Sequence, residues 1–319
     1  MNDVLKDTLD WAWAMLLAAG RHARAASPAA GHFTLGGDGE LAAIGAETPA
    51  AVLELRRDGV WIPARPLPGE MGALLDLYLP MCGRAPLTVA HLGQSIDGYV
   101  ATRSGDSSYV NGPENIRHLH RMRALADAVI VGAGTIAADN PRLTTRLVPG
   151  TNPVRVILDP RLRLSANCRV LTDGEAETLL VCSADVARER FGGSGFSRES
   201  RGAEIIGVPS GGVSLDLRAL LETLHARGLK RIFVEGGGTT VSRFLEAGLL
   251  DRLQIAVAPL VMGSGRPGLQ LPPSERIAEC LRPAHRIFVM GGDVLFDCDL
   301  RARAPAGDRA AGAPLARVY

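Results

Sequence analysis

The 319-residue chain carries 35 lysine and arginine residues against 34 aspartate and glutamate residues, and 46% of its residues are hydrophobic. This composition is typical of a globular protein with one large α/β domain and a smaller extra region. Because the charges nearly cancel, no overall positive field would attract nucleic acid or an anionic membrane, and any anion recognition must be local. We therefore expect neither nucleic acid nor a membrane among the partners.

The cysteines and the N-terminus favour a protein of the reducing cytoplasm. Five cysteines are scattered without a Cys-x-x-Cys spacing, which indicates free thiols. The apolar stretch Trp11–Ala19 follows several aspartates and is shorter than the roughly 20 residues of a membrane span. It predicts a buried or amphipathic helix rather than a signal peptide.

Residues 1–85 predict a small α+β region of unknown role. A helix is expected over 3–24, then strands near 41–44, 52–55 and 60–62 and a helix over 71–81. Asp58-Gly59 predicts a tight hairpin turn, and Arg84-Ala85-Pro86 a linker to the rest of the chain. The region lacks the His-x-Glu and Pro-Cys-x-x-Cys motifs of a zinc deaminase, so it is not one.

From residue 86 to about 302, short apolar runs alternate with helical stretches, as a mostly parallel sheet covered by helices requires. Strands are expected at 87–90, 128–131, 154–158, 178–181, 204–208, 231–234, 253–257, 287–289 and 294–296, and helices at 113–126, 214–227 and 239–248. Gly291-Gly292-Asp293 predicts a hairpin turn between the last two strands. We also expect a mobile Gly/Ser-rich loop over 192–201 and a disordered tail over 303–319.

A glycine-rich turn, Gly132-Ala133-Gly134-Thr135, follows the apolar run 128–131 and leads into a short helical segment that ends before Pro141. Glycines let the backbone approach a ligand, and the first amides of a helix bind anions. The string also matches the dinucleotide fingerprint Gly-x-Gly-x-x-Ala, for which Asp159 would be the ribose-binding acid. The helical segment is too short for a Rossmann crossover, which makes that interpretation the weaker one. A tight turn without a ligand is the other alternative.

A second glycine cluster, Gly236-Gly237-Gly238, follows the run 231–234. Three consecutive glycines offer no packing advantage, which indicates backbone amides left open to a phosphate, with Thr239 or Thr240 capping the next helix. Glu235, at the end of its strand, would face the same crevice. An ordinary loop with a surface acid is the alternative.

Several further segments, taken in order, carry a family resemblance. Asp97-Gly98 alone is only a turn signal. Together, however, several segments resemble the reductase domain of the bacterial bifunctional riboflavin-biosynthesis deaminase/reductase: Ser95–Gly98, Ser104–Val110, Thr135–Thr144, Val154–Asp159, Glu235–Gly237 and Ala258–Gly265.

The resemblance implies an α/β fold over 86–302, namely a dihydrofolate-reductase-like three-layer αβα domain with a mostly parallel mixed sheet. It also implies a homodimer that uses NADPH to reduce a ribosylamino-pyrimidine 5′-phosphate to its ribitylamino form, by hydride transfer to C1′. The substrate partner is therefore a phosphorylated small molecule.

By motif position, the resemblance also implies the site residues. The candidate cofactor-binding residues are Gly93, Tyr109, Thr135, Asp139, Gly236, Gly237, Gly238, Thr239 and Thr240. The candidate substrate-binding residues are Ser107, Arg123, Leu143, Arg146 and Glu235, of which the two arginines would clamp the phosphate. The candidate catalytic groups are Glu235, Asp97 and His91. The sequence shows no metal-ligand cluster, so no metal is expected.

Two positions depart from the family pattern. His91 stands where the riboflavin enzymes commonly have lysine, and it is either a proton donor or a packed strand histidine. Tyr109 stands where they usually have tryptophan, which keeps a stacking ring. These departures leave two alternatives open: a dihydrofolate- or pterin-type reductase on the same fold, and a non-catalytic NADPH-binding regulatory protein.

Overall fold

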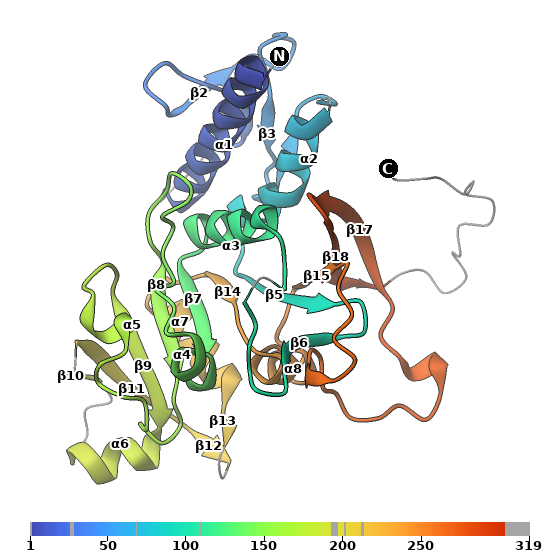
Figure 1. Ribbon diagram of the computed structural model, residues 1–319. Helices are drawn as coiled ribbons and strands as arrows, with labels where there is room; N and C mark the ends of the chain where they lie inside the picture. The colour runs from blue at the N-terminus through green and yellow to red at the C-terminus, as the bar shows by residue number, and fades with distance from the viewer. Residues whose placement is uncertain are drawn as a thin grey trace.

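The computed structural model describes residues 2–25, 29–67, 69–108, 110–192, 197–200, 202–211 and 214–303. Its centre is a ten-stranded sheet of order β10-β11-β9-β8-β7-β14-β5-β15-β18-β17 (Figure 1). Seven neighbouring strands run parallel: β11 (Ala203–Val208), β9 (Thr178–Ser183), β8 (Val154–Leu158), β7 (Ala128–Gly132), β14 (Arg231–Val234), β5 (Leu87–Ser95) and β15 (Arg252–Ala258). Antiparallel strands flank them: β10 (Ser197–Ser200), β18 (Asp293–Arg303) and β17 (Pro283–Met290). The mostly parallel mixed sheet expected from the sequence is confirmed.

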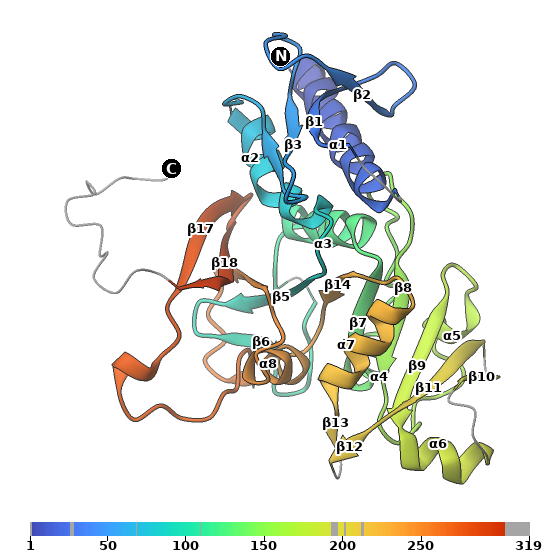
Figure 2. The ribbon, with the colours of Figure 1, turned by 180° about the vertical axis from the view of Figure 1, so that it is seen from behind.

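Helices cover both faces of this sheet, which gives the three expected layers. One hydrophobic cluster packs α3 (Pro113–Leu125) onto Val89, Val129 and Phe233. A second packs α7 (Leu217–Ala226) and α8 (Gly238–Glu246) onto the opposite face, as Figure 2 shows. Consecutive strand residues face opposite clusters, which explains why these strands appear as continuous apolar runs in the sequence.

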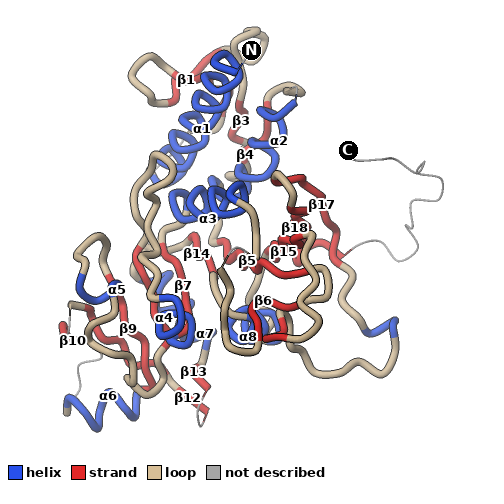
Figure 3. The backbone as a smooth tube through the Cα atoms, viewed as in Figure 1, coloured by secondary structure: helices blue, strands red, loops and turns tan. Residues whose placement is uncertain are grey.

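The described residues before β5 form two α-helices, a 3₁₀ helix and a small sheet at one end of the molecule (Figure 3). The elements are α1 (Asn2–Arg24), the antiparallel sheet β2-β1-β3-β4, α2 (Gly69–Tyr78) and the 3₁₀ helix η1 (Leu79–Cys82), with β1 at Gly31–Leu35, β2 at Leu41–Ile44, β3 at Leu53–Leu55 and β4 at Trp61–Pro63. Asp58-Gly59 does turn β3 into β4. The sequence analysis missed β1, because Phe33 is its one buried residue and gives no alternation to detect.

This N-terminal region shares its hydrophobic core with the sheet, so residues 84–86 do not separate two independent cores. Trp13 and Leu75 belong to the same cluster as Val89 and Met122. Polar contacts reinforce the packing: Trp13 Nε1 donates to Pro149 O at 3.0 Å, and Arg24 Nε lies 3.0 Å from Asp127 Oδ1.

Three local expectations change. Residues 214–215 pair as strand β13 with β12 (Ser210–Gly211), so α7 starts only at Leu217, where Asp216 caps it. The expected loop over 192–201 contains strand β10, and the rest of it, 193–196 and 201, lies outside the described residues. Strand β18 continues through Arg303, and the remainder of the expected tail also lies outside the described residues.

Candidate active site

A cavity of about 820 Å³ opens where β5, β7 and β14 end. These strands are neighbours in the sheet and parallel, so their carboxyl ends meet at one edge, where α/β folds bind ligands. Most sequence candidates line the cavity, namely His91, Gly93, Ser107, Arg123, Thr135, Asp139, Leu143, Glu235, Gly236, Gly237, Gly238, Thr239 and Thr240. Asp97 and Arg146 do not line it, and Tyr109 lies outside the described residues.

The two glycine turns meet at this cavity. The amide of Gly237 donates to Thr135 Oγ1 at 3.2 Å, which ties the turn after β14 to α4 (Ala133–Asp139) after β7. Helix α8 has Gly237 as its N-cap and α4 has Gly132, and neither cap makes a side-chain hydrogen bond. The expected capping of α8 by a threonine is therefore wrong. Both helices begin without a side-chain cap at the cavity wall, where first-turn amides can bind an anion.

Packing explains part of the glycine requirement that the sequence analysis assigned to ligand binding alone. A Cβ on Gly238 would lie 1.7 Å from Gly268 O, and one on Gly93 would lie 1.9 Å from Asn111 Oδ1. Gly236 has φ +110°, a conformation that favours glycine. The statement that consecutive glycines bring no packing advantage is therefore wrong at Gly238, where another backbone approaches closely.

Arg123 and Glu235 form a buried bidentate ion pair in the cavity wall. Arg123 Nε lies 2.6 Å from Glu235 Oε1 and Nη2 lies 2.7 Å from Oε2, and each side chain is 8% exposed. Arg123 Nη1 also donates to Thr144 O at 3.1 Å. The guanidinium is thus already neutralised, so the structure does not support Arg123 as a free half of a phosphate clamp. Its geometry instead fixes the carboxylate of Glu235.

Arg146 is exposed and carries no hydrogen bond or ion pair to another described residue. Burial and the nearby charges of Arg123 and Arg142 lower its pKa, while Glu175 opposes them. Arg146 is therefore an unpaired cation near Arg123, although it does not line the cavity.

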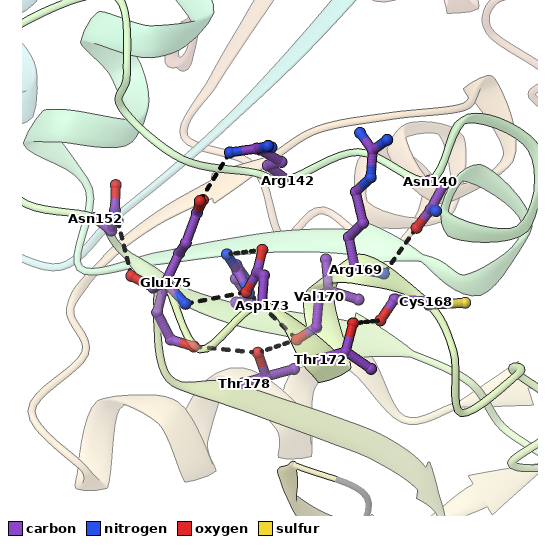
Figure 4. A network of polar contacts seen from close by, with 12 residues as sticks. Asn140, Arg142, Asn152, Cys168, Arg169, Val170, Thr172, Asp173, Glu175 and Thr178 are labelled. Carbon is purple, nitrogen blue, oxygen red and sulfur yellow. Dashed lines mark hydrogen bonds and ion pairs between the residues drawn. The ribbon is translucent and has the colours of Figure 1, made fainter.

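The segment between α4 and β8 is held by the polar network of Figure 4. Asn140 Oδ1 accepts from Arg169 N at 2.8 Å, and Arg142 pairs with Glu175 at 2.8 Å. Asn140 and Leu143 both adopt positive φ, +42° and +57°. A left-handed leucine is strained, and it persists only where the surroundings enforce it. Leu143 is buried and its side chain forms part of the cavity wall.

A row of buried polar side chains crosses the sheet beneath α3. His91 on β5 lies opposite Gln254 on β15, and Gln254 lies opposite Asp297 on β18. Helix α3 pairs with this row at successive points: His91 Nε2 lies 3.0 Å from Asn115 Oδ1, and His118 Nε2 lies 2.9 Å from Gln254 Oε1. Asn115, His118 and Gln254 were not among the residues predicted from the sequence. The signal that could have found them is a polar residue within an apolar strand or on the buried face of a helix.

Hydrogen-bond direction fixes the state of His91. An amide oxygen only accepts, so Nε2 carries the hydrogen that bonds Asn115, and Nδ1 is an acceptor. Burial lowers the pKa of His91 to about 4, with the Arg123 charge adding to the effect and the Asn115 bond opposing it. His91 is therefore neutral near pH 7. It is both packed in a strand and part of the cavity wall, but its one hydrogen is already used within the protein.

Asp97 and Asp159 serve the fold. Asp97 is exposed, and its carboxylate accepts from Ser95 Oγ and from the amides of Met262 and Gly263, at 2.6, 3.1 and 2.7 Å. Those bonds to Ser95 and the two amides lower its pKa. Asp159 is buried, does not line the cavity and accepts from Leu164 N at 2.7 Å, which does not support the ribose role of the Rossmann alternative. The Asp97 carboxylate therefore lies outside the cavity lining, with its hydrogen bonds made inside the protein.

The described residues contain neither a metal-ligand cluster nor a membrane-spanning helix. Within the described ranges, no three His, Cys, Asp or Glu side chains gather to hold a metal ion. No described helix is long and apolar enough to span a bilayer.

Comparison with known proteins agrees with the geometry of the site. The chain is 36% identical over 219 residues to a 2,5-diamino-6-ribosylamino-4(3H)-pyrimidinone 5′-phosphate reductase of Methanothermobacter thermautotrophicus, which covers 66% of this chain and 97% of that protein. It is 34% identical over 188 residues to a protein of the same name from Archaeoglobus fulgidus, covering 56% of this chain and 82% of that one.

Solved structures show the same fold. A deaminase/reductase from Thermotoga maritima superposes with a TM-score of 0.56 at 23% identity, covering 72% of this chain and 62% of that one. A riboflavin biosynthesis reductase from Saccharomyces cerevisiae superposes with a TM-score of 0.55 at 19% identity, covering 72% of this chain and 99% of that one. The family described as RibD C-terminal domain matches residues 86–285, which include the cavity lining and both glycine turns. The chain therefore belongs to the RibD C-terminal domain family.

Proposed function

We propose that this protein is an NADPH-dependent reductase that converts a ribosylamino-pyrimidine 5′-phosphate into its ribitylamino form, in a riboflavin-type pathway. One observation carries the proposal. The cavity sets two uncapped helix N-termini beside a fixed carboxylate, in a chain that matches nearly the whole length of a protein named as such a reductase.

The residues present fit a dinucleotide. Gly134 and Gly237 line the cavity, and the absence of a Cβ at these two positions keeps the backbone accessible there, whereas Gly93 makes room for Asn111. The first amides of α4 and α8 would hold the pyrophosphate, and Thr135 clasps the two turns together. NADPH supplies the hydride when bound. The chain's part is to orient both reactants and to exclude water.

We assign the substrate-binding and catalytic roles to the polar groups around the cavity. Arg146, with Ser107, would hold the substrate phosphate, because Arg146 has no hydrogen-bond or ion-pair partner among the described residues. Glu235, immobilised by Arg123, would accept hydrogen bonds from the substrate. His91 would act through the acceptor Nδ1 rather than as a general acid, since its hydrogen is used by Asn115. Burial raises the pKa of Asp139, and Ser107 and Arg266 oppose this rise.

The assay is substrate-dependent oxidation of NADPH, with deuterium on the transferable position followed into the product by mass spectrometry. We expect one deuterium at C1′ and a marked preference for NADPH over NADH. Dihydrofolate in place of the pyrimidine tests the pterin-type alternative. Tight NADPH binding without turnover of either compound would leave the regulatory alternative and refute the proposal.

A homodimer forms part of the proposal. Strand β17 is an edge of the ten-stranded sheet, and it exposes Ile287 and Val289, 53% and 41% accessible. Exposed edges with apolar side chains are surfaces that another chain can cover. Light scattering on the purified chain should give twice the mass of one chain. Replacing Ile287 by lysine should yield monomers, and a wild-type monomer would contradict this assignment.

A further inference from the structure

The buried polar row does not end within the family domain. Beyond His118 it reaches Tyr78, the last residue of α2 in the N-terminal region, whose hydroxyl lies 2.7 Å from His118 Nδ1. Tyr78 is 1% exposed and His118 is 1% exposed, so water cannot replace either partner. A residue outside the family match therefore completes a hydrogen-bonded set whose member His118 packs against His91 of the cavity wall.

The direction of each bond in this row is fixed from its far end. Asp297 is fully buried and pairs with Arg252 and Arg286, so its carboxylate accepts the amide hydrogen of Gln254 at 3.4 Å. The amide oxygen of Gln254 then faces His118 and requires a hydrogen on Nε2. His118 Nδ1 is consequently an acceptor.

Tyr78 supplies the matching donor. Burial raises the pKa of Tyr78 to about 12, so the phenol keeps its hydrogen, and the Arg121 guanidinium carbon lies 5.7 Å from the centroid of the Tyr78 ring. Donation by Tyr78 to Nδ1 satisfies the last open position of His118, and the imidazole is held in one tautomer and one orientation.

His118 in turn is the packing neighbour of His91. The two ring centroids are 5.2 Å apart, and both side chains emerge toward the layer between α3 and the sheet. Within the described residues no partner other than Asn115 bonds the His91 ring, so the ring of His118 limits its rotation.

We propose that Tyr78 is a positioning residue of the reductase site: through His118 it holds the imidazole of His91 with Nδ1 available to the cavity. The expected effect on reductase kinetics rests on the proposed function, whereas the expected effect on the His91 and His118 rings does not. It assigns a task to the N-terminal region, whose docking onto α3 would otherwise serve only stability.

The test is Tyr78→Phe in the full chain, which removes one hydroxyl and keeps the ring. Histidine ¹⁵N spectra, assigned with His91→Gln and His118→Gln, should show both rings as neutral Nε2–H tautomers in the wild type. In Tyr78→Phe the His118 signals should broaden or change tautomer, and those of His91 should shift. With the pyrimidine substrate, kcat/KM should fall about 10-fold, the loss expected for one well-placed hydrogen bond, with KM for NADPH within about 2-fold.

Two further variants separate positioning from general destabilisation. Trp61→Phe alters another buried aromatic of the N-terminal region whose Nε1 has no partner, and it should leave the spectra and the kinetics unchanged. In a His118→Gln background, Tyr78→Phe should cause no further kinetic loss, because the path through His118 is already broken.

The outcomes are distinguishable. Wild-type His91 signals in Tyr78→Phe would overturn the proposal whether or not the protein turns over substrate. An active wild type whose Tyr78→Phe variant keeps full kcat/KM would overturn it as well. Absence of reductase activity in the wild type would refute the proposed function, and the spectra would still decide the role of Tyr78.

Discussion

The Arg123–Glu235 pair and the unpaired Arg146 should respond to mutation in opposite ways. Arg123→Ala leaves the carboxylate of Glu235 buried without its cation. Both oxygens lose bonds of 2.6 and 2.7 Å, and Thr144 O loses a donor. Removing one partner of such a buried pair costs about 3–5 kcal/mol of folding free energy. At a few degrees per kcal/mol for a chain of this size, Tm should fall by about 10 °C.

Arg146→Ala should do the reverse, because Arg146 is exposed and has no partner among the described residues. Its free energy of unfolding should stay within about 0.5 kcal/mol of wild type. KM for the phosphorylated substrate should rise about 10-fold or more, whereas the dephosphorylated analogue should be affected little, since a charged hydrogen bond is lost only with the phosphate present.

Urea denaturation and steady-state kinetics on the two variants provide the assay. Arg188→Ala is the matched control for an arginine in an exposed ion pair, with Asp185, and it should change neither quantity. The reasoning fails if Arg123→Ala unfolds at the wild-type midpoint while KM for substrate rises. That result would make Arg123 the phosphate ligand that its sequence position first suggested.

Three other expectations follow from the same structure. Burial holds the pKa of His91 near 4, below its value in the unfolded chain, so between about pH 6.5 and 4 the unfolded chain binds a proton that the folded chain does not. Stability is therefore lost as the pH falls through that window. In urea titrations, His91 alone should lower the free energy of unfolding by about 2 kcal/mol from pH 7 to 5, with His118 and His120 adding in the same direction, and a flat profile would contradict this. Gly93→Ala would place a Cβ on Asn111 and should weaken NADPH binding about 10-fold by calorimetry, while Gly37→Ala, which meets no atom within 4 Å, should not; equal affinities would exclude the close approach at Gly93. Asp97→Asn should keep kcat within about 2-fold and lower Tm slightly, since the carboxylate bonds Ser95 and two loop amides outside the cavity. A large loss of kcat would restore Asp97 as a catalytic group.

Much of the fold could be predicted because its signals are local. Strands such as Val154–Leu158 and Arg231–Val234 were located to the residue, since an apolar run flanked by turn residues needs only neighbours in sequence to be recognised. Parallel order then brings the two glycine turns to one edge of the sheet, which is why most candidate residues do line a single cavity.

Residue type and motif position could not determine what each polar side chain bonds. Arg123 and Glu235 are 112 positions apart, and nothing local shows that they neutralise one another while Arg146 stays unpaired. Asp97 is a candidate catalytic group by its motif position, yet the amides of Met262 and Gly263 donate hydrogen bonds to its carboxylate.

The sequence by itself determined the α/β architecture, the glycine turns and the edge of the sheet at which ligands would bind, because each depends on periodicity and backbone preference over a few residues. Only the tertiary structure decided which charges are compensated, that the N-terminal region shares the core of the sheet, and that Tyr78 closes a polar row starting at His91. The physical reason is that burial and hydrogen-bond direction depend on partners brought together from distant parts of the chain.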